Sequence, residues 1–165
     1  MGTSGSGKTT LMNFIANRTR SKNLTYSGEI FVNGEKIENL DILRNRMVYV
    51  TQFDDGIFED LTVREQVEFT ARLSGVKNPT EKSKKILEFL GISEISESRI
   101  GGKNQRGISG GEKKRAAIAN ELISDPSIAF LDEPTSGLDS KSALDIAMIL
   151  RMMSHNGRTI VSIMH

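Results

Sequence analysis

The chain has 165 residues, of which 37% are hydrophobic, and this length and composition suit one folded domain with a substantial core. Its 22 basic and 21 acidic residues nearly balance, so charge gives no reason to expect nucleic acid or an anionic membrane as a partner. Cysteine is absent, which excludes disulfides and thiolate metal sites, and no apolar run approaches the roughly 20 residues that a membrane-spanning helix needs. We therefore expect any connection to a membrane to be made outside this chain.

The first motif is GTSGSGKT at residues 2–9, which fits the pattern GxxxxGK[ST] of a phosphate-binding loop. In such a loop the glycines let backbone N–H groups converge on phosphate oxygens at a helix N-terminus, where the helix dipole favours anions. Lys8 is expected to reach the β and γ phosphates, and the Thr9 hydroxyl to bind Mg²⁺. The alternative is a plain glycine-rich turn. The residues predicted to contact nucleotide are Gly2, Thr3, Ser4, Gly5, Ser6, Gly7, Lys8, Thr9 and Thr10.

The ends of the chain are unusual for a domain with this loop. A phosphate-binding loop normally joins a buried strand to a helix, yet Met1 stands directly before Gly2. The other end stops at His165, just after a strand-like run. We therefore expect the chain to be the core of a larger domain, incomplete at both ends.

Apolar residues recur with the helical or the strand period along the rest of the chain. The first helix is expected to present an apolar stripe of Leu11, Phe14 and Ile15, and the last helix one of Leu144, Ala147, Met148 and Met152. The predicted elements in chain order are a helix at 9–17, a hairpin at 27–37 turning at Asn33-Gly34, a strand at 47–51, helices at 62–73 and 80–90, a loop at 93–107, a helix at 110–124, a strand at 128–131, a helix at 140–154 and a strand at 159–164.

The order of these elements predicts the fold class. Strands and helices alternate at both ends of the chain, and helices dominate its middle. This order favours an α/β domain with a parallel sheet, built from residues 1–53 and 126–165 and carrying a partial antiparallel hairpin near 27–37. Residues 54–125 are predicted to form an inserted helical subdomain.

Two carboxylates, Asp132 and Glu133, follow the apolar run at 128–131, and Pro134 ends the strand. Carboxylates are unfavourable beside a buried strand unless an ion or a partner compensates for their charge. At the carboxyl end of a parallel strand they can face a ligand crevice, where Asp132 would coordinate Mg²⁺ indirectly. Glu133 is then placed to act as general base on the water that attacks the γ phosphate. The alternative is an exposed acidic turn.

Ser109-Gly110-Gly111-Glu112 opens the predicted helix at 110–124 and matches the S-x-x-E capping box. A plain helix start accounts for Ser109 and Glu112, but each glycine inside a helix costs about 1 kcal/mol relative to alanine. Bare glycines are favourable where a group such as a phosphate approaches the backbone closely. We therefore predict that this helix N-terminus contacts nucleotide.

Together these motifs resemble the nucleotide-binding domain of ATP-binding cassette (ABC) proteins along nearly the whole chain. GTSGSGKT resembles their Walker A, IAFLDE their Walker B and ISGGE their signature sequence. Gln52 resembles the Q-loop glutamine, residues 136–139 the D-loop, and His165 the switch histidine. Glu112, the basic run KKR after it and the run DEPTSGLDS resemble the G subfamily, the white and pleiotropic-drug type exporters.

The resemblance implies a P-loop NTPase with a RecA-like sheet, and ATP with Mg²⁺ at its site. Glu133, Gln52 and His165 are the implied catalytic residues. Gln52 is also an implied metal ligand, together with Thr9 and Asp132. The aromatic residue that stacks on adenine in this family would precede residue 1, so the base preference follows from the resemblance alone.

The resemblance also implies an assembly. The signature helix would contact the γ phosphate on a facing domain, and Asp139 would lie near the interface of a head-to-tail dimer with an identical or a different partner. A transmembrane domain would lie outside this chain, with the nucleotide domain on the cytoplasmic side. ATP hydrolysis would then power export of a lipid-like or hydrophobic substrate. One alternative is a soluble ABC ATPase that acts on ribosomes or DNA, and another is a non-hydrolysing regulatory module.

Overall fold

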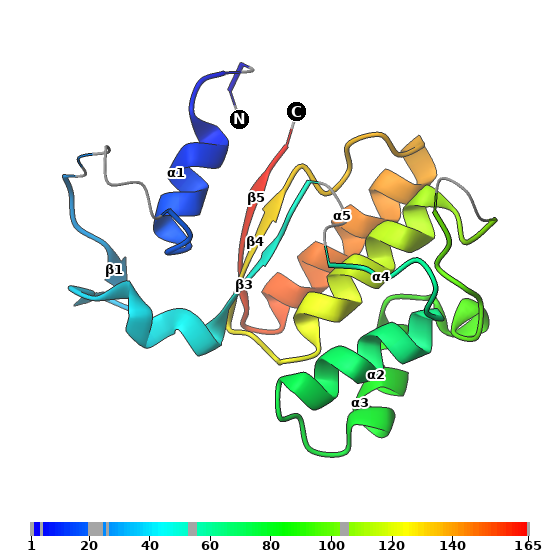
Figure 1. Ribbon diagram of the computed structural model, residues 1–165. Coiled ribbons are helices and arrows are strands. Elements are labelled where there is room, and N and C mark those ends of the chain that lie inside the picture. The colour runs from blue at the N-terminus through cyan, green and yellow to red at the C-terminus, as the bar shows by residue number, and fades with distance from the viewer. Residues whose placement is uncertain are drawn as a thin grey trace.

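The computed structural model describes residues 2–3, 5–19, 25, 27–52, 56–102 and 106–164. Its helices and strands follow one another along the chain as Figure 1 shows. The elements are α1 (Lys8–Ile15), β1 (Phe31–Val32), β2 (Glu35–Lys36), the 3-10 helix η1 (Leu40–Arg46), β3 (Met47–Val50), α2 (Val63–Leu73), α3 (Pro79–Phe89), the 3-10 helix η2 (Ser93–Ile95), α4 (Gly110–Leu122), β4 (Ile128–Asp132), α5 (Ser140–His155) and β5 (Thr159–Ile163).

Strands β3, β4 and β5 form a parallel sheet in that order, with β4 in the middle. The continuous apolar run of β4 is what a strand covered on both faces requires. Because the strands are parallel, β3 ends at Val50, β4 at Asp132 and β5 at Ile163 along one edge of the sheet. Ligands of parallel α/β sheets bind at this edge, so the strand ends are the place to look for a site.

Alternating side chains of the sheet pack on two different layers. On one face, Met12 of α1 packs against Tyr49, Phe130 and Ile163. On the other face, Leu131 and its alternating neighbours join a larger cluster with helices α4 and α5. Figure 1 shows α1 on one side of the sheet and α4 with α5 on the other. The period of two along each strand therefore fixes which helix each residue meets.

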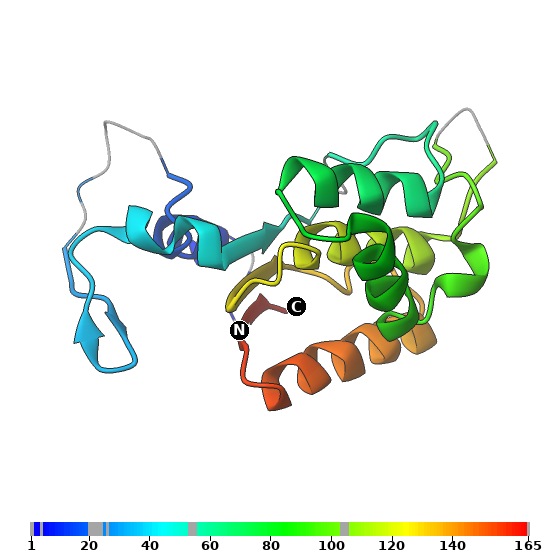
Figure 2. The ribbon, with the colours of Figure 1, turned by 90° about the horizontal axis from the view of Figure 1, so that it is seen from below.

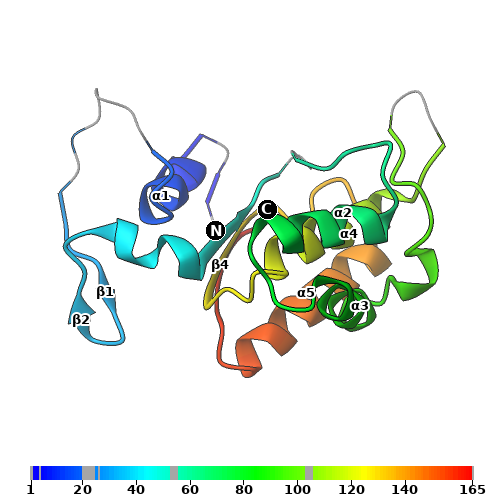
Figure 3. The same ribbon diagram turned by 60° about the horizontal axis from the view of Figure 1, so that its bottom comes forward.

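The larger cluster is continuous from the sheet to helices α2 and α3. Val67 of α2, Leu87 of α3, Ile118 of α4 and Leu131 of β4 all belong to it, and each is at most 2% exposed. Figures 2 and 3 show α4 between α2 and α5. A helix enclosed in this way needs apolar or small residues on several sides, which the buried run at 116–119 supplies. The division of the chain into a core and an insert at 54–125 stays a prediction.

The predicted helices and strands are all present, and their ends agree within about two residues except in the hairpin, whose strands are shorter than the predicted range 27–37. The predicted hairpin turns at Asn33 and Gly34, whose φ angles of 52° and 84° suit a tight hairpin turn. The 3-10 helix η1 was not predicted, and η2 lies inside the stretch predicted as a loop. Among the described residues, no helix has the length and apolar character that a membrane crossing requires.

Both predicted apolar stripes were partly wrong. In α1 the buried residue is Met12, whereas Leu11 is 61% exposed. In α5 the buried residues are Ile146, Ile149, Leu150 and Met153, whereas the predicted stripe members Leu144, Met148 and Met152 are exposed. Each helix carries apolar residues on two sides, so a helical period fits either side. The buried side of each helix is decided by the elements that it packs against, and the helical period of the sequence does not specify them.

Candidate functional site

The phosphate-loop residues shape the N-terminus of helix α1. Gly5 and Gly7 have φ angles of 78° and 85°, a left-handed conformation that glycine adopts without strain. Gly7 is the N-cap and makes no side-chain cap, and the first turn of α1 has no acidic residue. Neither a capping side chain nor an acidic residue therefore neutralises the positive end of the helix dipole, and the first N–H donors of the helix favour a bound anion.

Lys8, the first residue of α1, folds back over the loop. Its Nζ donates to the carbonyl oxygens of Gly2 and Thr3 at 2.6 and 2.8 Å. The ammonium is thus held at the phosphate loop, where it can exchange carbonyl partners for phosphate oxygens. Ser4, predicted to contact nucleotide with the rest of this loop, lies outside the described residues.

Asp132 is the last residue of β4 and is only 6% exposed. The Thr9 hydroxyl donates to its Oδ1 at 3.3 Å, and the Tyr49 hydroxyl donates to its Oδ2 at 3.1 Å. Burial raises the pKa of Tyr49 well above its usual value, and the nearby carboxylate of Asp132 raises it further, so the phenol stays a hydrogen-bond donor. The fold therefore places two of the three predicted metal-binding groups, Thr9 and Asp132, in direct contact, whereas the third, Gln52, is hydrogen-bonded to Glu133.

The oxygens of Thr9 and Asp132 are the hard ligands that Mg²⁺ prefers. Within the described ranges, no group of three histidine, aspartate or glutamate side chains is placed to hold a metal by itself. In nucleotide enzymes Mg²⁺ is usually bound through one or two protein groups together with substrate phosphates and water. This donor set therefore fits Mg²⁺ that arrives with a nucleotide.

Glu133 and Gln52 meet beside Asp132, although they follow different strands, β4 and β3. The Gln52 Nε2 donates to Glu133 Oε2 at 2.9 Å. Glu133 has a φ of 47°, and a non-glycine residue in this left-handed region stores roughly 1–3 kcal/mol of strain. The conformation is the more unusual because a residue before proline is normally extended. Such strain is typical of positions where the surrounding structure holds a side chain for a function.

The start of helix α4 forms a complete capping box. The Ser109 N–H and hydroxyl both donate to Glu112 Oε2 at 2.8 Å, and the Glu112 N–H donates to Ser109 Oγ at 3.3 Å. These bonds from Ser109 hold the pKa of Glu112 below its usual value. Ser109 and Gly110 are exposed, so the end of the helix is accessible to an outside group.

Gly111 has a packing reason within the chain. A Cβ added to it would lie 2.6 Å from Ser142 Oγ and 2.9 Å from Ser142 Cβ, whereas one on Gly110 would meet only Leu138, at 3.8 Å. Ser142 belongs to the cap of α5, where its N–H and hydroxyl donate to Asp139 at 3.0 and 2.7 Å. These bonds lower the pKa of Asp139. The first turns of α4 and α5 are therefore in contact through Gly111 and Ser142.

We expect Gly111→Ala to destabilise the domain and Gly110→Ala to leave its stability unchanged or slightly raised. Overpacking costs about 1–3 kcal/mol, and the better helix propensity of alanine offsets about 1 kcal/mol of this. Thermal unfolding of the nucleotide-free full-length protein should show a lower melting temperature for Gly111→Ala alone. Adding Ser142→Gly should restore part of the loss. Equal melting temperatures for the two alanine variants would show that the contact with Ser142 is not limiting.

The structure brings together the predicted residues at the phosphate loop and the strand ends, but the start of α4 lies apart from them. The phosphate loop, Thr9, Gln52, Asp132 and Glu133 gather around the strand ends. Helix α4 begins at its end farther from α1, on the other side of the sheet (Figure 1). His165, predicted as the switch histidine, lies outside the described residues.

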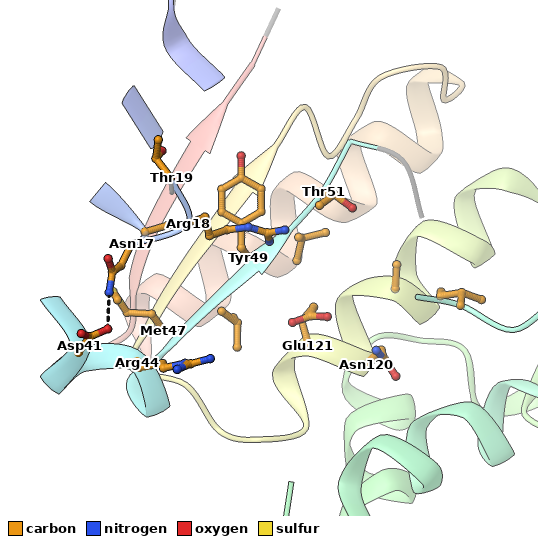
Figure 4. Close-up of a pocket in the computed structure, with 15 residues that line it drawn as sticks. Asn17, Arg18, Thr19, Asp41, Arg44, Met47, Tyr49, Thr51, Asn120 and Glu121 are labelled. Atoms are coloured by element: carbon orange, nitrogen blue, oxygen red, sulfur yellow. Dashed lines mark hydrogen bonds between the residues drawn. The ribbon is translucent and has the colours of Figure 1, made fainter. Parts of the chain in front are cut away.

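A cavity of about 600 Å³ lies along β3, away from the phosphate loop. Figure 4 shows it between the segment after α1, strand β3 and helix α4, with the Arg18 guanidinium 4.3 Å above the Tyr49 ring. None of the described phosphate-loop residues, 2–3 and 5–10, lines it, so the cavity is separate from that part of the predicted nucleotide site.

Sequence reasoning missed Tyr49 and Lys114, both of which contact the predicted site residues. A tyrosine in a buried strand usually needs a partner for its hydroxyl, and that rule could have paired Tyr49 with a carboxylate at a neighbouring strand end. Lys114 lies one helical turn before Ile118 and two before Leu122, on a stripe that is otherwise apolar. A lysine on such a stripe is a signal of a buried polar contact.

Comparison with known proteins agrees with the geometry. A family model described as ABC transporter matches residues 1–136. The chain is 45% identical over 170 residues to ABC transporter G family member 13 of Arabidopsis thaliana, covering 100% of this chain and 24% of that protein. It is 41% identical over 171 residues to the Broad substrate specificity ATP-binding cassette transporter ABCG2 of Bos taurus, covering 100% of this chain and 25% of that protein.

The chain spans about a quarter of the length of these curated relatives. The family match covers most of the chain and includes the phosphate loop, the signature sequence and both strand-end carboxylates. The chain therefore belongs to the ABC transporter family, and its resemblance to the G branch of that family extends over its whole length.

Proposed function

We propose that this chain binds and hydrolyses ATP as the nucleotide-binding domain of a G-type ABC transporter. The observation that supports this most is the arrangement at the strand ends. There the Thr9 hydroxyl meets the buried Asp132 carboxylate at 3.3 Å, and Gln52 holds the next carboxylate, Glu133, at 2.9 Å. A hard-oxygen pair at the end of a phosphate loop, beside a strained, hydrogen-bonded carboxylate, suits phosphoryl transfer.

In this mechanism the chain mainly positions charge, because phosphoryl transfer needs little covalent work from a protein. The N–H groups of the loop and the Lys8 ammonium bind the β and γ phosphates of the substrate. Mg²⁺, held by Thr9 and Asp132 with the phosphates, would neutralise charge that develops between them. Glu133 accepts the proton of the attacking water as the oxygen–phosphorus bond forms and the bond to the β-phosphate oxygen breaks, which releases ADP and phosphate.

We also propose that the site is completed by a second nucleotide-binding domain. The start of α4 is an exposed helix N-terminus, which favours an anion, but it lies across the sheet from the start of α1 (Figure 1). One phosphate group therefore does not meet both helices of a single chain. A head-to-tail pair would place the Ser109–Glu112 segment of each copy at the nucleotide of the other, with Asp139 near the interface.

The proposal extends to the whole protein. A transmembrane domain elsewhere in the protein would use the ATP-driven cycle to export a lipid-like or hydrophobic substrate, with this domain on the cytoplasmic side. The resemblance to ABCG2, whose name describes a transporter of broad substrate specificity, supports a transport function. ATP binding and release of its products then supply the two states that drive transport.

The experiment that tests the proposed function is an ATPase assay of the full-length protein in a membrane or detergent. We expect hydrolysis that needs Mg²⁺, stops with EDTA and returns when Mg²⁺ is added in excess. Stimulation by hydrophobic compounds would support the substrate class. Activity that is independent of divalent metal, or that responds to ribosomes or DNA and not to hydrophobic compounds, would contradict the proposal.

A further inference from the structure

Helix α4 contains a buried lysine whose head group contacts the backbone beside the proposed catalytic residues. Lys114 is 4% exposed, and its Nζ donates to the carbonyl oxygens of Gln52 at 2.8 Å and of Thr51 at 3.3 Å. Burying an ammonium group is strongly unfavourable unless hydrogen bonds compensate for the lost water. These bonds help to compensate for burying the lysine at this position.

The two carbonyl oxygens lie where the chain leaves strand β3. Figure 4 shows Thr51 at this end of the strand, facing helix α4. The side chain of the next residue, Gln52, donates to Glu133 Oε2 at 2.9 Å. A chain of hydrogen bonds therefore runs from Lys114, through the main chain and the amide of Gln52, to the carboxylate proposed as general base.

Gly56 and Phe58, which come shortly after Gln52 in the chain, are also tied to helix α4, through a buried side-chain amide. Gln66 of α2 is 1% exposed, accepts from the Phe58 N–H at 3.0 Å and donates to the Gly56 carbonyl at 3.2 Å. Its amide also donates to Asn120 Oδ1 of α4 at 3.0 Å. Helix α4 is thus tied to Thr51 and Gln52 directly, through Lys114, and to Gly56 and Phe58 indirectly, through Asn120 and Gln66.

We propose that Lys114 is a positioning residue for ATP hydrolysis, which fixes Gln52 to helix α4 and thereby sets the Glu133 carboxylate. The inference rests on the proposed ATPase function. Since Ser109 and Glu112 begin the same helix, Lys114 also joins the segment proposed to contact the partner's nucleotide to the general base of its own site. A displacement of α4 then moves Gln52 with it, and the orientation of Glu133 follows.

The test is a double-mutant cycle in the full-length protein with Lys114→Met and Gln52→Ala. Lys114→Met keeps the length of the side chain and removes its donors, and we expect a fall in kcat of about 10- to 100-fold, the size of effect that a small misplacement of a catalytic group produces. The KM for ATP and the affinity for ATP should change by no more than about twofold, because no phosphate contact is lost. Lys84→Met, on the exposed face of α3, is the matched control and should leave kcat unchanged.

If Lys114 acts through Gln52, Lys114→Met causes no further fall in kcat when Gln52→Ala is already present. An equal fall in both backgrounds, or a normal kcat for Lys114→Met, would overturn the proposal. If the methionine variant does not fold, Lys114→Gln, which keeps a neutral donor, should show the same non-additivity with a smaller fall.

Hydrogen exchange gives a second readout that does not depend on activity. In the nucleotide-free protein, Lys114→Met should speed exchange in the peptide that contains Thr51 and Gln52, and Lys84→Met should not. Unchanged exchange there would refute the contact itself. A wild-type protein without ATPase activity would refute the proposed function separately, whatever the exchange data show.

Discussion

Glu133→Gln should reduce ATP turnover by at least about 100-fold, since a general base contributes roughly 10²- to 10⁴-fold to a rate. The change removes the ability to accept a proton but keeps the size and shape of the side chain. In the structure Gln52 Nε2 donates to Glu133 Oε2 at 2.9 Å, and the amide oxygen of the variant can accept the same hydrogen bond. The arrangement of the site is thus retained while its chemistry is lost.

The same variant should bind ATP normally and accumulate as an ATP-bound dimer. Neither the phosphate loop nor the Thr9–Asp132 contact is altered, and these supply the proposed binding groups. Steady-state hydrolysis, equilibrium ATP binding and the oligomeric state with ATP are the measurements. Glu94→Gln, which changes an exposed carboxylate distant from Glu133 in the sequence, is the control. Turnover within a few-fold of wild type would remove Glu133 from the role of general base.

Lys8→Ala should weaken the binding of ATP itself by roughly 10- to 100-fold, because a hydrogen bond to a charged group contributes about 1.5–3 kcal/mol. In the structure the Lys8 ammonium donates to the Gly2 and Thr3 carbonyl oxygens, so it lies at the loop. The variant loses the charge that the β and γ phosphates would attract.

A nucleotide titration of the full-length protein measures this effect. Lys77→Ala, which removes an exposed lysine between α2 and α3, is the matched control and should bind ATP as the wild type does. AMP lacks both of the phosphates in question, so its affinity should be the same for Lys8→Ala and wild type. Equal ATP affinities for Lys8→Ala and Lys77→Ala would place the phosphates elsewhere.

The sequence predicted the elements well because their signals are local. The apolar run of β4, the Asn33-Gly34 turn and the capping box of α4 each contain their own structural reason within a few residues. The proximity of Thr9 and Asp132, which are 123 residues apart, was predicted because both were assigned to Mg²⁺, Thr9 from the phosphate-loop pattern and Asp132 from its place at the carboxyl end of a parallel strand.

The contacts that sequence reasoning missed depend on packing between elements. The Tyr49–Asp132 and Lys114–Gln52 hydrogen bonds join residues 83 and 62 positions apart, and no local pattern pairs them. The role of Gly111 also depends on a contact between elements that the sequence pattern does not reveal. Its lack of a side chain suggested the approach of a phosphate, but the structure also provides Ser142 as a close neighbour. Which face of α5 is buried likewise depends on the sheet, as the exposed Met148 shows.

A structure of the full-length Glu133→Gln protein with ATP and Mg²⁺ would decide whether the nucleotide lies between two copies of this domain. The triphosphate should contact the phosphate loop and Lys8 of one domain and the start of helix α4 of the facing domain. A triphosphate bound at the phosphate loop, with Ser109 of every copy far from any nucleotide, would contradict the shared site.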